Sequence, residues 1–432
     1  MPSVALYTLG CKVSQYETEA VGERFADLGF EIISCRTPAD VYVINTCTVT
    51  AESDRKSRQV IRRFRSANPD AVIAVMGCYS QRSAAEVAEL PVDIVIGTDG
   101  KMALPDMVLS MLRERERKQC VSVGSLDGVA FEPMCIRKAP RTRAYVKIED
   151  GCESRCTYCA ISSARGPVRS KPREDVITEV ESLFATGVRE IVLTGIETGS
   201  YGRDFNTGYG LADLIAELNE RGSAERIRLG SLAPELIGRE FAERVRGLSI
   251  LAPHFHLSMQ SGSDRVLAAM KRRYNRKMAL ASIEHLKENI PGVRFTTDLM
   301  VGFPGETEED FLDTVDLVRR VRFIGCHVFA YSKREGTPAA SYPNQVSEAV
   351  KRRRSAELIR VAAEVRDEVL SELVEIGDAL GCILETYKDG CYTAHSDEFA
   401  EVCVPALPGM EGEYVSVKPI SHKNGIIYGE IL

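Results

Sequence analysis

Gly151-Cys-Glu-Ser-Arg-Cys-Thr-Tyr-Cys-Ala160 is the segment from which the organisation of the whole chain can be worked out. Its cysteines Cys152, Cys156 and Cys159 have the spacing Cys-x3-Cys-x2-Cys and follow a predicted strand at 144–148. Three thiolates on one loop can hold three irons of a [4Fe–4S] cube and leave the fourth iron open to a bound substrate. Zinc is the weaker alternative, because a structural zinc site takes four ligands and no fourth Cys or His lies nearby.

A repeated strand–helix pattern continues from this segment toward the C-terminus. The expected strands are 144–148, 191–194, 227–231, 254–259, 295–301 and 326–331. The expected helices between them are 174–186, 211–221, 276–287 and 308–321, and a long helix is expected at 346–373. Six such units are enough for an open barrel with its chemistry at the carboxyl ends of the strands. We therefore expect a partial (β/α)6 barrel over residues 135–370.

A second alternating pattern precedes the barrel, in residues 1–125. Apolar strands are expected at 4–9, 41–45, 71–76 and 92–96, with crossover helices at 17–28, 51–67 and 81–90. Such a pattern is typical of an open parallel sheet in an α/β domain. A surface linker is expected at 111–134, where a run of charges is followed by a Gly/Ser/Asp cluster.

Cys11, Cys47 and Cys78 each follow a strand of this first domain. Because the carboxyl ends of parallel strands meet at one edge of a sheet, we expect the three side chains to converge on a second cluster site. A single cysteine at a strand end would be explained as a small buried residue, but three at one edge favour a site. A catalytic Cys/His pair is weaker, since no histidine precedes His254.

Residues 371–432 have a different character. Short strands at 381–387, 391–395, 401–404 and 413–418 are separated by turn pairs such as Asp389-Gly390, which predicts a small all-β barrel. This segment holds three Lys, no Arg and eleven Asp or Glu, a charge of −8, which leaves +1 for residues 1–370. An acidic barrel is a poor match to the phosphates of a nucleic acid.

Composition excludes several other classes of protein. The 432 residues are 44% hydrophobic and 27% charged, as in folded globular proteins, and the net charge is −7. The N-terminus has no secretory pattern, and no apolar run reaches the ~18 residues of a membrane span, so we expect a cytoplasmic protein without a membrane partner. Thirteen cysteines in such a compartment indicate metal or redox chemistry rather than disulfides.

Together these features resemble the radical S-adenosylmethionine (SAM) methylthiotransferase family over essentially the whole chain, with the tail similar to a TRAM domain. The branch that modifies threonylcarbamoyladenosine in tRNA is the most similar. Two departures from the family pattern, Ser14 in place of Asn and Ser162-Ser163 in place of Pro-Tyr, remove no ligand. The segments that carry the resemblance are Thr8-Leu-Gly-Cys-Lys-Val-Ser-Gln-Tyr-Glu-Thr-Glu19, Asn45-Thr-Cys-Thr-Val-Thr50, Arg165-Gly-Pro-Val-Arg-Ser170, Leu257-Ser-Met-Gln-Ser-Gly262, Met270-Lys-Arg-Arg-Tyr274 and Val301-Gly-Phe-Pro-Gly-Glu-Thr307.

The resemblance implies a transferase that adds a 2-methylthio group to N6-threonylcarbamoyladenosine next to the tRNA anticodon. Its cofactors would be two [4Fe–4S] clusters, at Cys152/Cys156/Cys159 and at Cys11/Cys47/Cys78, and SAM, so no side-chain acid or base is expected to be catalytic. Its partners would be the tRNA anticodon stem-loop, a reductant such as flavodoxin or ferredoxin, and a sulfur donor. The residues expected to contact SAM are Tyr158, Gly195, Glu197, Ser258, Gln260 and Gly302. Those expected to contact RNA are Arg165, Arg169, Lys271, Arg272 and Arg273.

Two other functions remain open on the sequence. The acidic tail favours the same reaction on a ribosomal-protein aspartate, because an acidic barrel would attract a basic protein. A non-catalytic iron–sulfur electron carrier would need the clusters but no SAM pocket.

Overall fold

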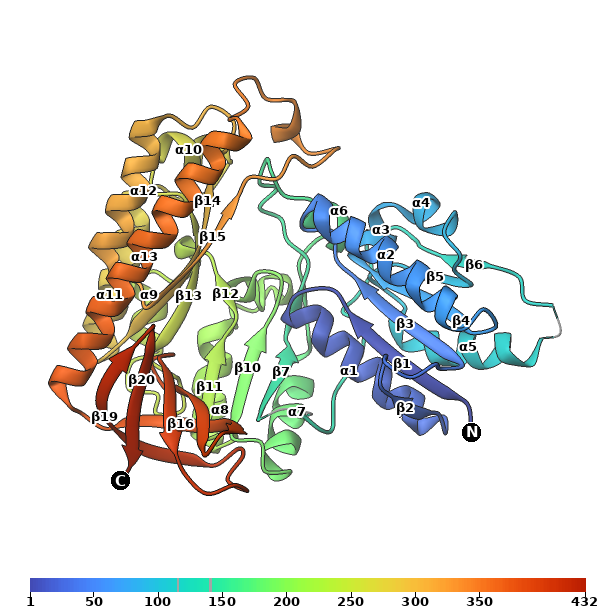
Figure 1. Ribbon diagram of the computed structural model, residues 1–432, viewed down its shortest axis with the longest axis horizontal. Helices are drawn as coiled ribbons and strands as arrows, with labels where there is room; N and C mark the ends of the chain where they lie inside the picture. Colours follow the sequence, from blue (N-terminus) through green and yellow to red (C-terminus); the bar gives the residue numbers. More distant parts are fainter. Residues whose placement is uncertain (115, 140–141) are drawn as a thin grey trace.

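The N-terminal sheet is built from parallel strands that lie inside the protein. In the computed structural model, which describes residues 1–114, 116–139 and 142–432, six parallel strands have the order β2-β1-β3-β4-β5-β6 (Figure 1). Every residue of β3 and β4 is buried, as expected for apolar strands covered on both faces. The strands are β1 Ser3–Thr8, β2 Glu31–Ile33, β3 Val41–Thr46, β4 Val72–Gly77, β5 Ile94–Ile96 and β6 Cys120–Ser122.

Helices cover both faces of this sheet. One face packs Val21 and Phe25 of α1 and Leu104 of α5, and the other packs Ile61 and Phe64 of α2. The helices are α1 Lys12–Asp27, α2 Ala51–Ala67, α3 Cys78–Arg82, α4 Ala84–Ala88 and α5 Leu104–Arg113. The carboxyl ends of β1, β3 and β4 therefore form one edge, which faces the next domain (Figure 1).

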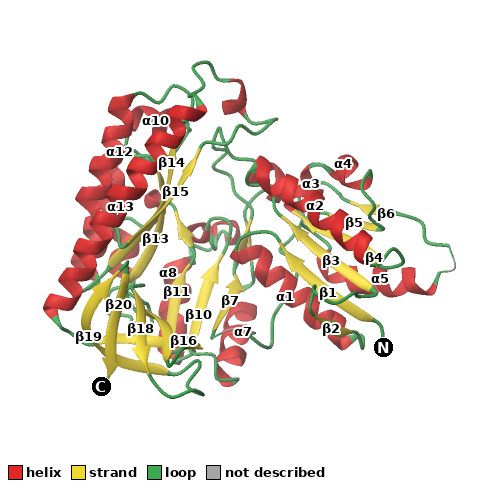
Figure 2. Ribbon diagram, in the orientation of Figure 1, coloured by secondary structure: helices red, strands yellow, loops and turns green. Residues whose placement is uncertain are grey.

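The central part is an open half-barrel of parallel strands surrounded by helices (Figure 2). A sheet ordered β11-β10-β7 and a sheet ordered β12-β13-β14-β15 follow one another around it. The strands are β7 Arg143–Lys147, β10 Glu190–Thr194, β11 Arg226–Leu229, β12 Ser231–Leu232, β13 His254–Gln260, β14 Arg294–Val301 and β15 Gly325–Ala330. A short antiparallel pair is formed by β8 Glu149–Asp150 and β9 Arg169–Ser170. The helices are α6 Ile161–Arg165, α7 Arg173–Ala185, α8 Leu211–Arg221, α9 Arg239–Arg244, α10 Asp264–Ala269, α11 Arg276–Asn289, α12 Glu308–Val321 and α13 Glu348–Ile376.

Each of the six strands expected in this part of the sequence is confirmed to within about two residues. The expected strand 227–231 is split into β11 and β12 around Gly230. A Cβ at Gly230 would lie 2.7 Å from Thr198 Oγ1, so only glycine lets the strand pass this point.

Two short strands of the first sheet were not expected. The segment expected as a linker, 111–134, contains β6, which pairs with β5, and it buries Leu126, Phe131 and Met134. These apolar residues are too widely spaced to give a strand or helix pattern, and edge strands such as β2 and β6 are too short to show one. The boundaries at 125, 135 and 370 stay predictions.

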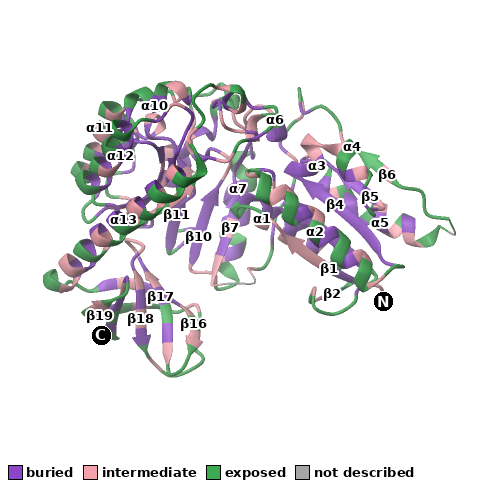
Figure 3. Ribbon diagram, turned by 45° about the horizontal axis from the view of Figure 1, so that its top comes forward, coloured by how far each residue is buried: buried purple, intermediate pink, exposed green. Residues whose placement is uncertain are grey.

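Helix α1 joins the first sheet to the half-barrel. Its Tyr16 lies in the core of the half-barrel, and the hydroxyl donates to Met134 O at 2.8 Å and to Glu179 at 3.0 Å. The same helix buries Val21 and Phe25 in the core of the first sheet. Figure 3 shows the buried strands of the first sheet and the half-barrel on the two sides of α1. The cysteine-bearing edge is thus held rigidly against the half-barrel.

The C-terminal segment forms a closed five-stranded barrel in the order β16-β17-β18-β20-β19, as the sequence predicts. Its strands are β16 Leu380–Lys388, β17 Cys391–Ser396, β18 Glu401–Pro405, β19 Tyr414–Lys423 and β20 Ile426–Ile431. Among the helices that the structure describes, none combines the length and apolar character needed to cross a bilayer.

The acidic residues of this barrel contact arginines at the amino ends of the half-barrel strands. Asp397 pairs with Arg226 at 2.5 Å, and Glu385 pairs with Arg143. The ring of Phe399 stacks on His254 with centroids 4.4 Å apart. Part of the negative charge of the tail is therefore neutralised within the chain itself.

Candidate functional site

The loop between β8 and α6 carries Cys152, Cys156 and Cys159. Hydrogen bonds fix it: Thr157 N donates to Met270 O at 3.1 Å, and Thr157 Oγ1 donates to Ala269 O at 2.9 Å. The amide of Ile161 points at the sulfur of Cys159, with an N–S distance of 3.3 Å. This loop thus holds its three sulfurs at the carboxyl end of the first strand of the half-barrel, where the sequence predicts the chemistry.

Burial keeps the thiols of Cys152 and Cys159 protonated when they bind no metal. Burial raises the pKa of Cys159 to about 12 and also raises the pKa of Cys152. At Cys156, Nη1 of Arg272 lies 3.4 Å from the sulfur. A buried set of free thiols with a cationic neighbour fits iron, which deprotonates its thiol ligands.

The second set of cysteines converges as the strand ends predict. Cys11 is the N-cap of α1, Cys47 follows β3 and Cys78 begins α3. A Cβ at Gly10 would lie 3.7 Å from the Cβ of Cys47, so the segments after β1 and β3 are in contact. Burial is the main cause that raises the pKa of Cys78 to about 12, and the neighbouring Cys47 and Cys11 add to it. The structure therefore brings these three side chains together.

Neither set of cysteines forms a mononuclear site. Within the described part of the chain, no three His, Cys, Asp or Glu side chains gather closely enough to hold a single metal ion. A cube of four irons instead binds its cysteines at separate corners.

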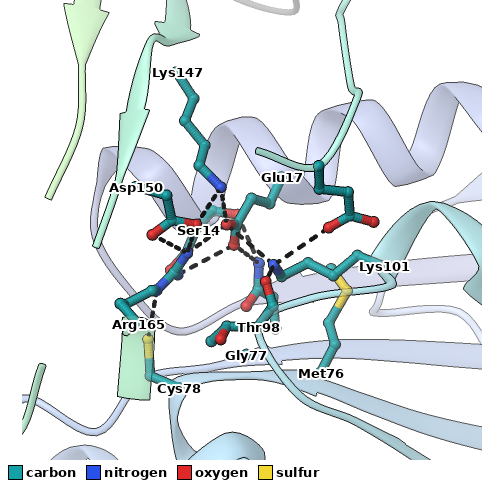
Figure 4. A network of polar contacts seen from close by, with 12 residues as sticks. Ser14, Glu17, Met76, Gly77, Cys78, Thr98, Lys101, Lys147, Asp150 and Arg165 are labelled. Carbon is teal, nitrogen blue, oxygen red and sulfur yellow. Dashed lines mark hydrogen bonds and ion pairs between the residues drawn. The ribbon is translucent and has the colours of Figure 1, made fainter. Parts of the chain in front are cut away.

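A buried network of charges connects the two cysteine sites (Figure 4). Arg165 donates to Glu17 at 2.5 Å and to Asp150 at 3.1 Å, and its Nε lies 3.1 Å from the sulfur of Cys78. Lys147 reaches the same two carboxylates at 2.8 and 2.6 Å. Burial opposes the ionisation of Glu17 and Asp150, but the surrounding cations outweigh it, holding the pKa of Glu17 well below its usual value and that of Asp150 at about 2.

The segment after β10 has the geometry of a small-molecule cradle. A Cβ at Gly195 would lie 2.4 Å from Glu149 Oε2, so a larger residue here would displace this carboxylate. Glu197 donates its amide to Glu149 Oε2 at 2.9 Å and accepts from Ala233 N at 3.0 Å. Burial raises the pKa of Glu197 to about 7. The buried Oε1 of Glu149 has no hydrogen-bond partner within the described residues, so a ligand bound here can form a hydrogen bond with it.

The other residues expected to contact SAM lie around the same cysteine loop. Gln260 has φ +61° at an irregularity in the pairing of β13, and its buried Oε1 has no partner among the residues that the structure describes. Such strain in a non-glycine residue is typical of binding sites. The carbonyl of Ser258 accepts from Arg272 at 3.1 Å. Tyr158 packs edge-on against Phe303, with centroids 6.5 Å apart.

Gly302 has the properties of a turn residue. It has φ +73°, and its amide donates to Glu306 Oε2 at 2.6 Å. A Cβ there would lie 2.4 Å from Lys351 Cγ. These contacts explain the glycine without a ligand, so its contact with SAM stays a prediction.

The residues expected to contact RNA fall into two groups. Lys271 and Arg273 are exposed, as phosphate contacts require. Arg165 is fully buried and occupied by carboxylates, and Arg169 is 6% exposed with its Nη2 3.5 Å from Asp150. Arg272 faces the sulfur of Cys156. The expectation of a phosphate contact is thus wrong for Arg165 and Arg169, because partners far apart in sequence enclose them, and Arg272 is oriented toward the cysteine loop instead.

Several residues of the site were not anticipated. Glu17, Lys147 and Asp150 have no motif spacing of their own, because each acts through a partner on another element. Glu17 does lie in the segment from Thr8 to Glu19 that carries the family resemblance, and this is the local signal that the sequence offers for it.

Comparisons with known proteins agree with this architecture. Residues 146–318 match the radical SAM superfamily, and residues 3–97 match a family described as uncharacterized protein family UPF0004. The threonylcarbamoyladenosine tRNA methylthiotransferase MtaB of Bacillus subtilis is 40% identical over 100% of this chain and 96% of its own length. The MtaB protein of Thermotoga maritima is 38% identical over 84% of this chain and 83% of its own. The tRNA-2-methylthio-N(6)-dimethylallyladenosine synthase of Acetivibrio thermocellus is 35% identical over 86% and 79%.

Solved structures support the fold. The radical S-adenosylmethionine methyltransferase TsrM from Kitasatospora setae, solved with cobalamin and a [4Fe–4S] cluster, aligns with a TM-score of 0.57 at 16% identity over 78% of this chain and 77% of that one. At this identity the likeness shows the fold alone. The full-length relatives show more: the chain belongs to the radical SAM methylthiotransferase family, whose cofactors are SAM and two iron–sulfur clusters.

Proposed function

We propose that this protein adds a 2-methylthio group to N6-threonylcarbamoyladenosine beside the anticodon of tRNA. The observation that carries the proposal is the pair of three-cysteine sites, at the edge of one sheet and at the mouth of a half-barrel, joined through Arg165. Relatives at 37–40% identity bear the name of this activity. The reaction needs two cofactors to act on one base, and the contact of Arg165 with Cys78 supports a close approach of the two sites.

The cysteines supply the ligands. Cys152, Cys156 and Cys159 would hold the cluster that binds SAM, and the other three would hold the second cluster. When bound, the clusters, SAM and an electron from a reductant would supply the radical that removes hydrogen from C2 of the adenine and the sulfur that replaces it, and a second SAM would supply the methyl group. The buried network around Glu17 and Arg165 holds the two loops at a fixed separation, which a reaction between two bound groups requires.

Glu197 is the residue that we assign to the amino group of SAM. Its carboxyl is buried beside Gly195, where the backbone comes close to Glu149. A bound ammonium would favour the ionised carboxylate and release the proton that burial retains. Gln260 and Ser258 lie at the carboxyl end of β13 and would hold the ribose.

The RNA would contact the exposed side chains near the cysteine loop. Lys271 and Arg273 lie just after α10, and Arg273 Nη2 donates to Glu153 O within that loop at 2.7 Å. Unpaired anticodon bases are read by stacking and by their edges, so these two cations would position the backbone. A small one-electron reductant and a sulfur donor complete the partners, and we place the reaction in the cytoplasm with its tRNA.

The acidic barrel does not favour a protein substrate. Asp397 and Glu385 are paired with arginines of the half-barrel, so they are not available to attract a basic protein. An electron carrier would not need the cradle formed by Gly195, Glu197 and Gln260.

The test is a single-turnover assay with cluster-loaded protein, SAM, a chemical reductant and an anticodon stem-loop that contains threonylcarbamoyladenosine. We expect the 2-methylthio product by mass spectrometry. SAM cleavage without any change in the RNA would contradict the proposal, and methylthiolation of a ribosomal protein under the same conditions would replace it.

A further inference from the structure

A chain of hydrogen-bonded polar side chains lies on the inner face of the half-barrel. His254 Nε2 and His256 Nδ1 both lie 2.9 Å from Thr296 Oγ1. His256 Nε2 lies 3.3 Å from Asp298 Oδ2, whose Oδ1 lies 3.2 Å from His327 Nδ1. We call His256, Thr296, Asp298 and His327 the inner-face cluster. Neither the cysteine sites nor the SAM cradle includes these residues.

Strand alternation places the cluster on the open side of the sheet. Phe255, Leu257 and Leu299 belong to the core beneath the helices, so the side chains between them point the opposite way. The side chains of His256 and Asp298 are 21% and 28% exposed. A ligand bound inside the half-barrel would therefore contact them.

The inner-face cluster is close to the SAM site. Ser258 is the next residue of β13 on the same face after His256, which is a rise of roughly 7 Å. The carbonyl of Ser258 accepts from Arg272, which in turn contacts the sulfur of Cys156. A group that reaches from the reacting base into the half-barrel would thus arrive at the inner-face cluster.

Lys12 faces the same space from the first domain. It is the first residue of α1, directly after Cys11, and it is exposed. The charged groups that act on it come from four half-barrel strands: Arg143 on β7, Glu190 on β10, Arg228 on β11 and Asp298 on β14. Lys12 therefore adjoins the second cysteine site and is close enough to Asp298 of the inner-face cluster for their charges to interact.

The carboxylates near Lys12 already have other partners. Glu190 pairs with Arg226 at 2.5 Å and with Arg143 at 3.2 Å. Asp298 is held by its two histidines. Within the described ranges, the ammonium of Lys12 makes no hydrogen bond or ion pair. A cation without a partner, beside a polar inner face, is suited to an anionic ligand.

The names of the relatives contain two different substituents on N6 of adenosine, threonylcarbamoyl and dimethylallyl, and these differ in polarity. A threonylcarbamoyl group carries a carboxylate, a hydroxyl and urea N–H groups, whereas a dimethylallyl group is wholly apolar. In adenine only N1 separates C2 from C6, so a substituent on N6 leaves the ring beside the carbon that is modified. The substituent must then lie near both cysteine sites, where Lys12 and the inner-face cluster lie.

We propose that Lys12 binds the carboxylate of the threonylcarbamoyl group, and that Asp298 and His327 bind its hydroxyl and urea groups. This inference rests on the proposed function and adds the residues that determine its specificity. A dimethylallyl group would leave these polar side chains without partners, and a site built for polar contacts rejects an analogue that lacks them.

The test measures the affinity of the cluster-loaded protein for three anticodon stem-loops that differ only in one base: threonylcarbamoyladenosine, dimethylallyladenosine or adenosine. By fluorescence anisotropy at fixed salt, we expect wild type to bind the first RNA most tightly. Lys12→Met should weaken that binding about tenfold, as for the loss of a charge-assisted hydrogen bond, and leave the other two unchanged. Lys12→Arg should restore most of the preference.

Iron content and SAM cleavage serve as controls, because Lys12 adjoins Cys11. His327→Ala, on β15 and not adjacent in sequence to a cluster cysteine, provides a second variant that should lower the preference about threefold. The inference is overturned if wild type prefers the threonylcarbamoyl RNA and both Lys12→Met and His327→Ala keep the full preference. If wild type binds the three RNAs equally and modifies none, the proposed function itself fails and the inference fails with it.

Discussion

The Nε of Arg165 lies 3.1 Å from the sulfur of Cys78, although Cys78 begins helix α3 beside the N-terminal sheet and Arg165 ends helix α6 of the half-barrel. Arg165 ends the short helix that follows Cys159, so one side chain links the loop of the first cysteine site to a ligand of the second. Its other two nitrogens donate to Glu17 and Asp150. This buried guanidinium is therefore a direct link between the two sites, within the network that also contains Lys147.

Removal of this guanidinium should destabilise the protein strongly. Arg165→Met leaves Glu17 and Asp150 buried with too little positive charge, and we expect the free energy of unfolding to fall by about 3–5 kcal/mol in urea titrations. Arg137→Met is the matched control, since Arg137 pairs with Glu23 and Asp27 at the surface and should change stability by less than about 1 kcal/mol. Equal effects of the two variants would contradict the role of the network.

The two sets of cysteines should bind iron independently. Cys156→Ala and Cys47→Ala lie in different sites, so each should lose about half of the iron of the reconstituted protein. Cys391→Ala, in the C-terminal barrel, should lose none. The measurement is iron per chain after anaerobic reconstitution. Full iron content in either site variant would contradict the assignment of that site.

Binding of SAM should depend on pH through Glu197. Its carboxyl has a pKa of about 7 because it is buried, so below this pH a bound ammonium must displace a proton. We expect the affinity for SAM to rise with pH by up to about tenfold per unit and to level off above about pH 7. Equilibrium dialysis from about pH 5.5 to 8.5 measures it. Glu197→Gln should bind more weakly and without this slope, and a parallel slope in that variant would assign the titration to another group.

RNA binding should depend on salt through the exposed cations after α10. Lys271→Ala should reduce the slope of log affinity against log salt by about 0.7, the value for one contact with a single strand. Lys287→Ala, on the far end of α11, is the control and should leave the slope unchanged. An unchanged slope for Lys271→Ala would move the RNA path elsewhere on the protein.

Much of this architecture follows from local patterns in the sequence. The strands of the half-barrel are continuous apolar runs or alternate with period two. Cys11, Cys47, Cys78 and Cys152 stand shortly after strands, and Cys156 and Cys159 follow Cys152 at a recognisable spacing, so these features are local. The prediction that Arg165 and Arg169 contact RNA is wrong because both side chains bind carboxylates on other elements. For Arg165 these partners lie 15 to 148 residues away in the sequence. The inner-face cluster is not predictable from local sequence for the same reason, because His256, Asp298 and His327 come together only when three strands pair.

The net charge of the acidic tail, residues 371–432, is a second property that does not predict the binding partner correctly. A charge of −8 argues against RNA when it is treated as a property of an isolated domain. In the structure Asp397 and Glu385 face Arg226 and Arg143, so net charge did not describe the surface that a partner meets.

The most direct test of the central claim is nucleoside mass spectrometry of bulk tRNA from cells with and without this gene. We expect the 2-methylthio form of threonylcarbamoyladenosine to disappear on deletion and to return with the wild-type gene, but not with Cys156→Ala or Cys47→Ala. An unchanged tRNA profile after deletion would contradict the account.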